Sequence, residues 1–406
     1  MNSTANPTPR QTIPKTPATL PPTSKAGTIG AVGGGQLAWM MAIAARSLGL
    51  SLRVQTPNST DPAVAEAVGY IEAAVDDATA TATLAESCQA IAFENEFVDL
   101  DALQPLTDQG VEFVPPLASL RPLLDKYEQR CYSRDIGLPT PGFCLLETPE
   151  AFDLAAVGGA FPVVLKARRH GYDGQGTAIA HSLAEVTAIW ERWGRPSVEV
   201  EEFVPFAREL AVIAARDRRG NLTMYPIIET QQEDRVCRRA IAPAQVSDKV
   251  AHQCEAIART LLAALDAIGV FAIELFLTAD DRVLVNEIAP RTHNSGHLTI
   301  EASHCSQFEQ IIRIAAGLPL GDPSLNCAGA LMVNLLGTTA DQQTEDRQRQ
   351  QLAAIPGATV HWYGKASRPG RKLGHVTVTF DGVELGDLRD RALAVSRQIE
   401  AIWYGS

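Results

Sequence analysis

The sequence VFAIELFLTADDRVLVNEIAP, residues 270–290, predicts a β-hairpin that carries an acidic residue inside each strand. Two apolar runs rich in β-branched and aromatic residues flank a polar connection, which is typical of two antiparallel strands. If the connecting loop has an even number of residues, Glu274 lies directly opposite Glu287. A loop with an odd number of residues would instead place Asn286 or Ile288 opposite Glu274.

Two facing glutamates in apolar strands indicate a cation site. Directly opposed residues have Cβ atoms about 5 Å apart, so the carboxylates of Glu274 and Glu287 would reach one point. An uncompensated charge in such a strand is costly. Mg²⁺ prefers oxygen ligands, keeps part of its water and is readily shared with a phosphate, so it would resolve that cost. The alternative is that each glutamate pairs with an arginine.

A lysine followed by a glycine-rich segment lies upstream of the hairpin. The apolar run FPVVLK ends at Lys166, and glycines follow at 171, 174 and 176. Such glycines let backbone amides approach phosphate oxygens, and the lysine adds positive charge. Neither the P-loop pattern nor G-x-G-x-x-G matches. An ordinary hairpin turn would explain the glycines alone, but Lys166 and the downstream carboxylates favour a phosphate-binding loop.

Two further segments are candidates for anion binding. The basic segment HWYGKASRPGRKLGH, residues 361–375, contains no acidic residue although the chain has a net charge of -12. It predicts capture of a small phosphorylated anion, with a solvated basic loop as the alternative. Arg291 and His293 directly follow the hairpin and could orient a small anion. His293 and His297 have the spacing of zinc ligands, but no H-E-x-x-H is present, so zinc is disfavoured.

The sequence before these motifs predicts a parallel α/β sheet. Strands are expected at 28–32, 52–55 and 90–93, a triple glycine at 33–35 precedes an expected helix at 36–48, and a short helix is expected at 62–68. Strands that alternate with helices indicate a doubly wound sheet. Ligands bind such sheets at the carboxyl ends of the strands, where the triple glycine and Glu94-Asn95-Glu96 both lie.

The rest of the chain is richer in strands, which are expected at 163–166, 197–203, 209–215, 223–227, 270–277, 283–288, 330–336, 359–363 and 375–380, with a helix at 249–265. The fold class is therefore α/β and α+β. We expect a Rossmann-like domain at 27–120, a central domain at 121–320 and a small β-rich domain at 321–406. Residues 1–26, with six prolines and six threonines, are expected to be a disordered extension; a cleaved targeting segment is the alternative.

Composition restricts the class of protein. The chain of 406 residues has 47 acidic and 35 basic side chains, which argues against a nucleic-acid or anionic-membrane partner because both require a positive surface. No apolar run approaches the roughly 20 residues that span a bilayer. Seven scattered cysteines without a C-x-x-C spacing fit reduced thiols and a cytoplasmic location.

Together these motifs resemble the ATP-grasp superfamily and, within it, closely resemble the 5-(carboxyamino)imidazole ribonucleotide synthetases of purine biosynthesis. The resemblance covers the chain from about Gly27 to the C-terminus. It rests on G-G-G-Q-L, R-x-G-Y-D-G-x-G, N-E-x-A-P-R-x-H-N-S-G-H and W-Y-x-K-x-x-R-P-G-R-K-x-G-H, which occur here at 33–37, 169–176, 286–297 and 362–375. The last two patterns are long enough to be specific.

The resemblance implies an activity and a set of site residues. The activity is the ATP- and Mg²⁺-dependent carboxylation of 5-aminoimidazole ribonucleotide by bicarbonate, through carboxyphosphate, in a homodimer. ATP would be bound by Lys126, Lys166, Gly171, Tyr172, Asp173, Gly174, Gln175, Gly176, Thr177, Glu201, Glu202, Phe203, Val204, Glu209, Gln232, Asn286 and Glu287. The ribonucleotide would contact Gly34, Gln36, Glu96, Tyr172, Asp173, Lys365, Arg371 and Lys372. Arg291, His293 and Lys365 would be catalytic, and Glu274 and Glu287 would hold the metal.

The chain departs from the family pattern at several positions. Ala38-Trp39 replaces a usual Gly-Arg, Gln175 replaces a usual cation, and Gln232 replaces a common histidine. Two alternatives remain at this point, another ATP-grasp ligase such as a formate-dependent glycinamide ribonucleotide transformylase, and a nucleotide sensor without catalysis. The joint presence of Lys166, Glu274 and Glu287 opposes the sensor, because sensing needs no pair of metal-binding carboxylates.

Overall fold

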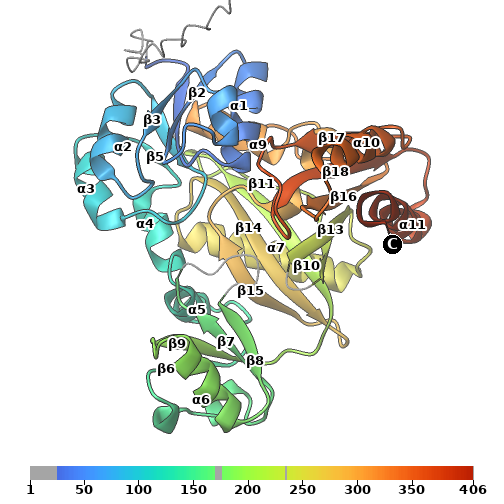
Figure 1. Cartoon of the computed structure of the whole chain (residues 1–406). Coiled ribbons are helices and arrows are strands. Elements are labelled where there is room, and N and C mark those ends of the chain that lie inside the picture. The colour runs from blue at the N-terminus through green and yellow to red at the C-terminus, as the bar shows by residue number, and fades with distance from the viewer. Residues whose placement is uncertain (1–24, 170–175, 234–235, 406) are drawn as a thin grey trace, which may run out of the picture.

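The computed structural model describes residues 25–169, 176–233 and 236–405, and it contains three β-sheets (Figure 1). A parallel sheet forms the N-terminal part, and a four-stranded antiparallel sheet forms a separate lobe at the opposite end of the molecule. A nine-stranded antiparallel sheet lies between them. The expected extension at 1–26 lies almost wholly outside the described residues.

The N-terminal sheet confirms the expected βα alternation. Its strands are parallel in the order β3-β2-β1-β4-β5. Their bounds are β1 (Thr28–Val32), β2 (Ser51–Thr56), β3 (Gly69–Glu72), β4 (Ala90–Phe93) and β5 (Phe113–Val114). The helices are α1 (Gln36–Ser47), α2 (Ala78–Ala85), α3 (Leu100–Asp108) and α4 (Leu117–Leu120). The helix expected at 62–68 is only a 3₁₀ turn, Pro62–Ala65, within the connection 57–68 between β2 and β3.

The four-stranded sheet has the order β6-β9-β7-β8. It consists of β6 (Phe143–Leu146), β7 (Val163–Ala167), β8 (Thr177–Ala180) and β9 (Val198–Glu202), with α6 (Leu183–Arg192) packed beside it. Helix α5 (Lys126–Asp135) connects this lobe to the rest of the molecule (Figure 1). The α5 sequence is strongly polar, and the sequence analysis did not expect a helix there.

The nine-stranded sheet contains the carboxylate hairpin at one edge. Its order is β15-β14-β10-β12-β13-β16-β18-β17, with β11 beside β10. The bounds are β10 (Phe206–Arg216), β11 (Leu222–Met224), β12 (Ile228–Glu233), β13 (Val236–Ala242), β14 (Gly269–Thr278), β15 (Val283–Ala289), β16 (Gly329–Leu336), β17 (Ala358–Trp362) and β18 (Lys372–Phe380). Strands on both sides of the expected boundary at residue 320 share this sheet, and the division into domains stays a prediction.

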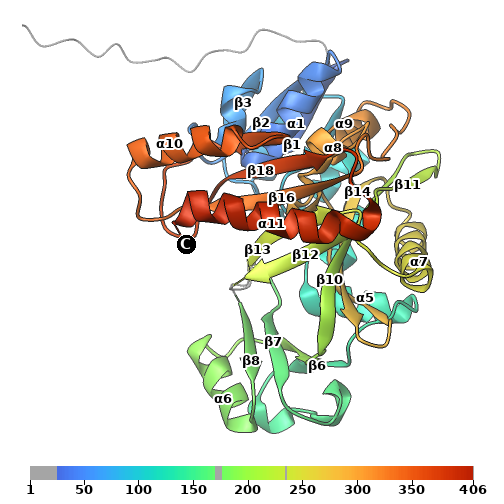
Figure 2. The same cartoon turned by 90° about the vertical axis from the view of Figure 1, so that its right-hand side faces the viewer.

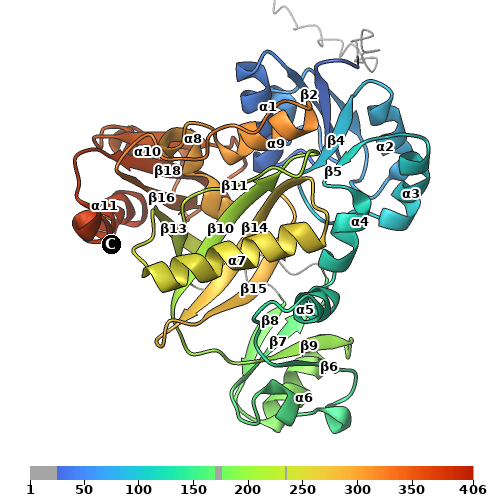
Figure 3. The same ribbon diagram turned by 180° about the vertical axis from the view of Figure 1, so that it is seen from behind.

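Helices cover both faces of the large sheet. Helix α7 (Asp248–Ala264) runs across β10 and β15 on one face (Figure 3). On the other face α9 (Gln307–Ala315), preceded by α8 (Thr299–Ala302), packs between the sheet and α1. Helices α10 (Gln342–Ala353) and α11 (Leu385–Tyr404) lie beside the C-terminal strands (Figure 2). Along β14, alternate residues pack against α9 and α7. The side chain of Glu274 lies on the same face of the sheet as α9, and it lines a cavity there.

Candidate active site

A cavity of about 330 Å³ lies where the three parts of the molecule meet. The N-terminal sheet contributes Gln36 and the segment Glu94–Phe97, and the large sheet contributes Gln232, Glu274 and Glu287. The remaining polar lining consists of Lys126, Thr177, Arg291, His293, Asn294 and Lys372. Residues from distant parts of the sequence, which the motifs assigned to nucleotide, metal and anion binding, therefore border one space.

The predicted pairing of Glu274 with Glu287 is confirmed, although the register expected beside the loop was wrong. The strands flank a connection of four residues, 279–282, but Leu277 pairs with Val283, a register that differs by one residue from the expected one. In that register Asn286 would lie opposite Glu274. A β-bulge between Glu274 and Leu275 leaves Asn286 without a partner on β14 and restores the pairing of Glu274 with Glu287.

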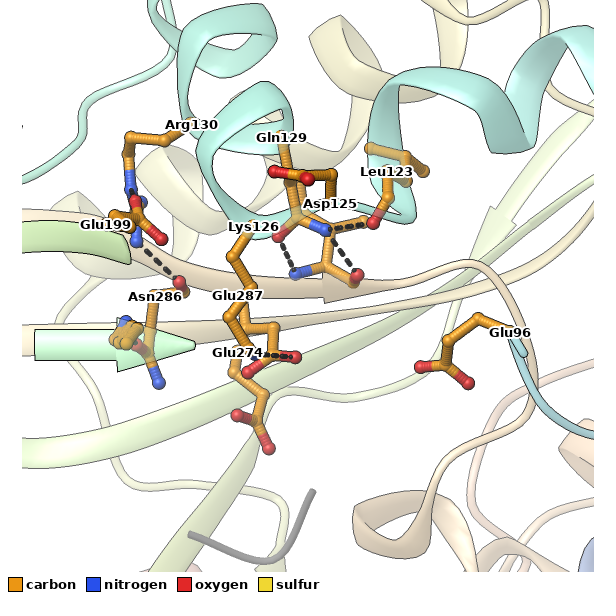
Figure 4. Close-up of polar contacts among 12 residues, drawn as sticks. Glu96, Leu123, Asp125, Lys126, Gln129, Arg130, Glu199, Glu274, Asn286 and Glu287 are labelled. Carbon is orange, nitrogen blue, oxygen red and sulfur yellow. Dashed lines mark hydrogen bonds and ion pairs between the residues drawn. The ribbon is translucent and has the colours of Figure 1, made fainter. Parts of the chain in front are cut away.

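The two lysines predicted to contact ATP bind carboxylates of this region. Lys126 begins α5, which Asp125 caps, and its Nζ lies 2.5 Å from Oε1 of Glu287. Lys166 Nζ lies 2.7 Å from Oε2 of Glu201 and donates a hydrogen bond of 3.1 Å to Oδ1 of Asn286. Figure 4 shows Lys126, Glu287 and Glu274 close together, with Asn286 to their left. Positive charge thus lies directly beside the carboxylate pair.

The carboxylates differ in their electrostatic environments. Burial, and then the charges of Glu287 and Glu209, raise the pKa of Glu274 to about 7. Burial also disfavours ionised Glu287, but the adjacent Lys126 outweighs it and lowers the pKa of Glu287 below its usual value. Within 25–169, 176–233 and 236–405 there is no group of three or more His, Cys, Asp or Glu side chains able to hold a metal. The pair nevertheless fits a hard cation that keeps water and phosphate as further ligands.

The residues expected at the anion end are partly engaged with one another. Arg291 donates two hydrogen bonds to Glu96, of 2.6 and 3.0 Å. Lys365 Nζ donates to Oε1 of Gln36, and burial lowers the pKa of Lys365 to about 8. His293 Nδ1 lies 2.9 Å from the hydroxyl of Ser295. The ion pair of Arg291 with Glu96 therefore joins the central and N-terminal parts within the lining of the cavity.

Some predicted residues lie away from this cavity. Arg371 does not line it, and its Nη1 donates to the carbonyl of Ala366. Gly34 lies in the turn before α1, where its carbonyl accepts from Ala63. In the expected adenine group, Glu202 and Val204 line a second cavity of about 400 Å³ beside the hairpin tip. Phe203 lies between them in the sequence, just after β9.

Glu201 and Glu209, which were both predicted to bind ATP, lie in different surroundings. Glu201 is buried and pairs with Arg130 and Lys166, so its carboxylate is not directed at solvent. Glu209 lies on β10 opposite Phe276 of β14, and burial raises its pKa to about 7.

In the glycine-rich loop, the carbonyl of Gly176 accepts a hydrogen bond from the amide of Ala167. The expectations for Gly171, Tyr172, Asp173, Gly174 and Gln175 lie outside the described residues.

Three residues of the site were missed by the sequence analysis. Glu94 lines the cavity, and burial raises its pKa; its place after an apolar strand, two residues before Glu96, was an available signal. Arg130 and Glu199 are buried and ion-paired with each other, 3.4 Å apart. No local pattern could have revealed that pair, because the two residues meet only when α5 packs against β9.

Family models match three consecutive parts of the chain. They describe a ribonucleotide synthetase preATP-grasp domain at 26–122, an ATP-grasp domain at 132–308 and a phosphoribosylaminoimidazole carboxylase C-terminal domain at 330–386. The fold, the paired carboxylates and the neighbouring lysines thus define an ATP-grasp enzyme. No helix of the described chain is long and apolar enough to cross a membrane.

Individual relatives identify the family. The N5-carboxyaminoimidazole ribonucleotide synthase of Synechococcus elongatus is 50% identical over 376 residues, which are 92% of this chain and 95% of that protein. An ADP complex of an N5-carboxyaminoimidazole ribonucleotide synthetase has a TM-score of 0.84 and 32% identity, with 96% and 99% of the two chains covered. The Aspergillus clavatus enzyme with ADP and 5-aminoimidazole ribonucleotide has a TM-score of 0.82 and 30% identity over 92% and 99%. The chain belongs to the N5-carboxyaminoimidazole ribonucleotide synthetase family, as the sequence motifs indicated.

Proposed function

We propose that this enzyme uses ATP and bicarbonate to carboxylate the exocyclic amine of 5-aminoimidazole ribonucleotide, with release of ADP and phosphate. Family membership supports the ligase activity. The observation that carries the proposal is the single cavity in which the carboxylate pair Glu274 and Glu287 lies beside Arg291, His293 and Lys372. One end can hold nucleotide phosphates, and the other can hold a small anion and a phosphorylated acceptor.

We propose that the chemistry proceeds through carboxyphosphate. A bicarbonate oxygen attacks the γ-phosphorus of ATP and ADP leaves. The amine of the ribonucleotide then attacks the carboxyl carbon and phosphate leaves. Mg²⁺ held by Glu274 and Glu287 would neutralise charge on the transferred phosphoryl group. The role of Lys126 and Lys166 is to hold the ATP phosphates, and Asn286 orients Lys166 through the hydrogen bond between their side chains.

The remaining site residues take roles at the other end of the cavity. Arg291 and His293 hold bicarbonate and the carboxyphosphate formed from it. The positive charge of Arg291 is suited to this role, because bicarbonate and carboxyphosphate are both anions. Lys365, Arg371 and Lys372 bind the phosphate of the ribonucleotide. Gly34, Gln36 and Glu96, which belong to the N-terminal part of the protein, border the ribonucleotide on the side of that part. On the nucleotide side, Glu209 binds the ribose, residues 201–204 frame the adenine, and residues 171–177 and Gln232 complete the ATP site.

The test is the release of phosphate from MgATP in bicarbonate buffer, with and without 5-aminoimidazole ribonucleotide. We expect release that depends on the ribonucleotide, with one ribonucleotide consumed for each ATP. Release that is indifferent to the ribonucleotide would refute the acceptor, and no release would favour a nucleotide sensor. We also propose a homodimer in the cytoplasm, from the family resemblance and the reduced cysteines; light scattering tests the dimer.

A further inference from the structure

Strand β15 is the free edge of the large sheet, but side chains from α5 occupy that edge. Gln129 accepts a hydrogen bond of 2.7 Å from the amide of Ile288 and donates one of 2.9 Å to the carbonyl of the same residue. It thereby makes both hydrogen bonds that a neighbouring strand would make. The amide of Val285 donates to the carbonyl of Pro139 at 2.8 Å, so the outward-facing groups of this stretch are satisfied.

Arg130, the next residue of α5, binds the same edge. Its Nη1 donates to the carbonyl of Val285 at 2.5 Å, and its Nη2 donates to the carbonyl of Asn286 at 2.7 Å. The guanidinium also pairs with Glu199 and Glu201, and only 4% of Arg130 is exposed. The residue therefore links the carbonyls of Val285 and Asn286 to the buried acids of β9. Figure 4 shows Arg130 beside Glu199 and Asn286.

The contacts match the bulged register of β15. In a regular strand, residues whose amides face outward are two apart. Here the outward amides are those of Val285 and Ile288, three apart, because Asn286 is the inserted residue. The side chains follow the same spacing, since Val285 and Ile288 both pack in the cluster formed with α7. Gln129 and Arg130 could not make these bonds to a strand without the bulge.

We infer that Gln129 and Arg130 are positioning residues that hold the β15 bulge and so direct Glu287 into the cavity. This inference rests on the proposed metal role of Glu287. Neither residue lines the cavity, so each acts through the backbone of β15. The same helix supplies Lys126, one turn earlier, which contacts Glu287 directly. Helix α5 thus sets both the carboxylate and its neighbouring lysine.

The two residues differ in what a substitution leaves behind. Loss of Arg130 would remove the buried positive charge that pairs with Glu199 and Glu201. Removing one partner of a buried ion pair is strongly destabilising. Within the described part of the chain, the side chain of Gln129 has hydrogen bonds only to backbone groups of Ile288 and Leu123. Gln129→Leu keeps the volume and removes these bonds, so it is the cleaner variant. Arg130→Lys, which keeps the charge but loses the planar fork, is the second variant.

The experiment measures the affinity for ADP by calorimetry, with Mg²⁺ and with EDTA, on the full chain. Loss of residues that orient metal ligands typically weakens metal affinity about 10- to 100-fold. We expect Gln129→Leu to reduce the Mg²⁺-dependent gain in ADP affinity about tenfold and to leave metal-free binding within about twofold. Arg134→Ala removes an exposed arginine from the same helix, and it should bind ADP as the wild type does.

A second measurement applies even if a variant is unstable. We expect faster hydrogen exchange in a peptide covering 283–290 of Gln129→Leu and Arg130→Lys, and an unchanged rate in Arg134→Ala. Wild-type protein without any Mg²⁺-dependent gain would refute the metal role itself. A wild-type gain that both folded variants retain, together with unchanged exchange, would overturn the positioning role alone.

Discussion

Glu274 and Glu287 lie directly opposite each other across a hairpin whose register beside the loop would have kept them apart. The pairing of Leu277 with Val283 sets a register that would bring Asn286 opposite Glu274, and one inserted residue restores the pairing of Glu274 with Glu287. The bulge has a second effect, because Glu287 then lines the cavity while the neighbouring Asn286 accepts a hydrogen bond from Lys166. A local irregularity of one strand therefore assembles the carboxylate pair.

Glu287→Gln is expected to abolish ATP turnover while the fold stays intact. The amide is similar in size but carries no charge, so it neither compensates Lys126 nor holds a cation. Ribonucleotide-dependent phosphate release, measured beside the far-ultraviolet circular dichroism spectrum, checks this. Turnover near the wild-type rate in the folded variant would refute the metal assignment.

Lys372→Ala should chiefly raise the KM for the ribonucleotide. Lys372 lines the cavity at its anion end, and the loss of one charge-assisted bond to a phosphate costs about 1.5–3 kcal/mol, which is about ten- to a hundredfold in affinity. Arg368→Ala is the matched control, because Arg368 is an exposed cation of the same loop. An unchanged KM in Lys372→Ala, or an equal rise in both variants, would contradict the assigned contact.

The activity is expected to depend on the protonation of Lys365. Burial lowers the pKa of Lys365 to about 8, so its charge is lost as the pH rises through that value. The KM for the ribonucleotide should therefore rise above about pH 8, as the phosphate contact weakens. Lys365→Arg keeps the charge at every accessible pH and should flatten the profile. A wild-type KM that stays constant from pH 7 to 9 would exclude this role.

The free energy of unfolding of the protein without metal should fall as the pH rises from about 4.5 to 7. The folded state raises the pKa of Glu274 from 4.5 to about 7, so the folded protein holds a proton that the unfolded chain releases across this range. Such a shift corresponds to about 3 kcal/mol at most. Urea unfolding in EDTA tests it, with Glu274→Gln expected to show a shallower decline. Equal slopes for the two proteins would show that Glu274 does not titrate there.

Gly33→Ala is expected to destabilise the N-terminal sheet more than Gly49→Ala. Both glycines have positive φ, +113° and +71° respectively, but an added Cβ at Gly33 would lie 2.5 Å from the Glu94 carboxylate. At Gly49 nothing lies within 4 Å, so only backbone strain of about 1–2 kcal/mol remains. Thermal unfolding should separate the variants, and a smaller effect at Gly33 would contradict the close packing of Glu94.

Much of the fold followed from local patterns in the chain. The strand at Thr28–Val32 and the helix from Gln36 were predicted to within a residue, because apolar periodicity and glycine breaks act over short distances. The hairpin with Glu274 and Glu287 was likewise predicted, as were the motifs that identify the family. Helix α5 was not expected, because its polar sequence has no apolar periodicity and its buried residues Gln129 and Arg130 contact backbone groups and acidic side chains of distant strands.

Some features could be predicted from the sequence and others could not, because the interactions that determine them act over different distances along the chain. Alternation, turn residues and motif spacing are properties of neighbouring residues, so the sequence alone established the elements and the residue types of the site. Three relationships instead depend on contacts between distant segments: the bulge at Asn286, the support of β15 by Gln129 and Arg130, and the pairing of Arg291 with Glu96. They arise only when α5, β9, β15 and the N-terminal sheet are packed together, because no residue specifies its remote partner by itself.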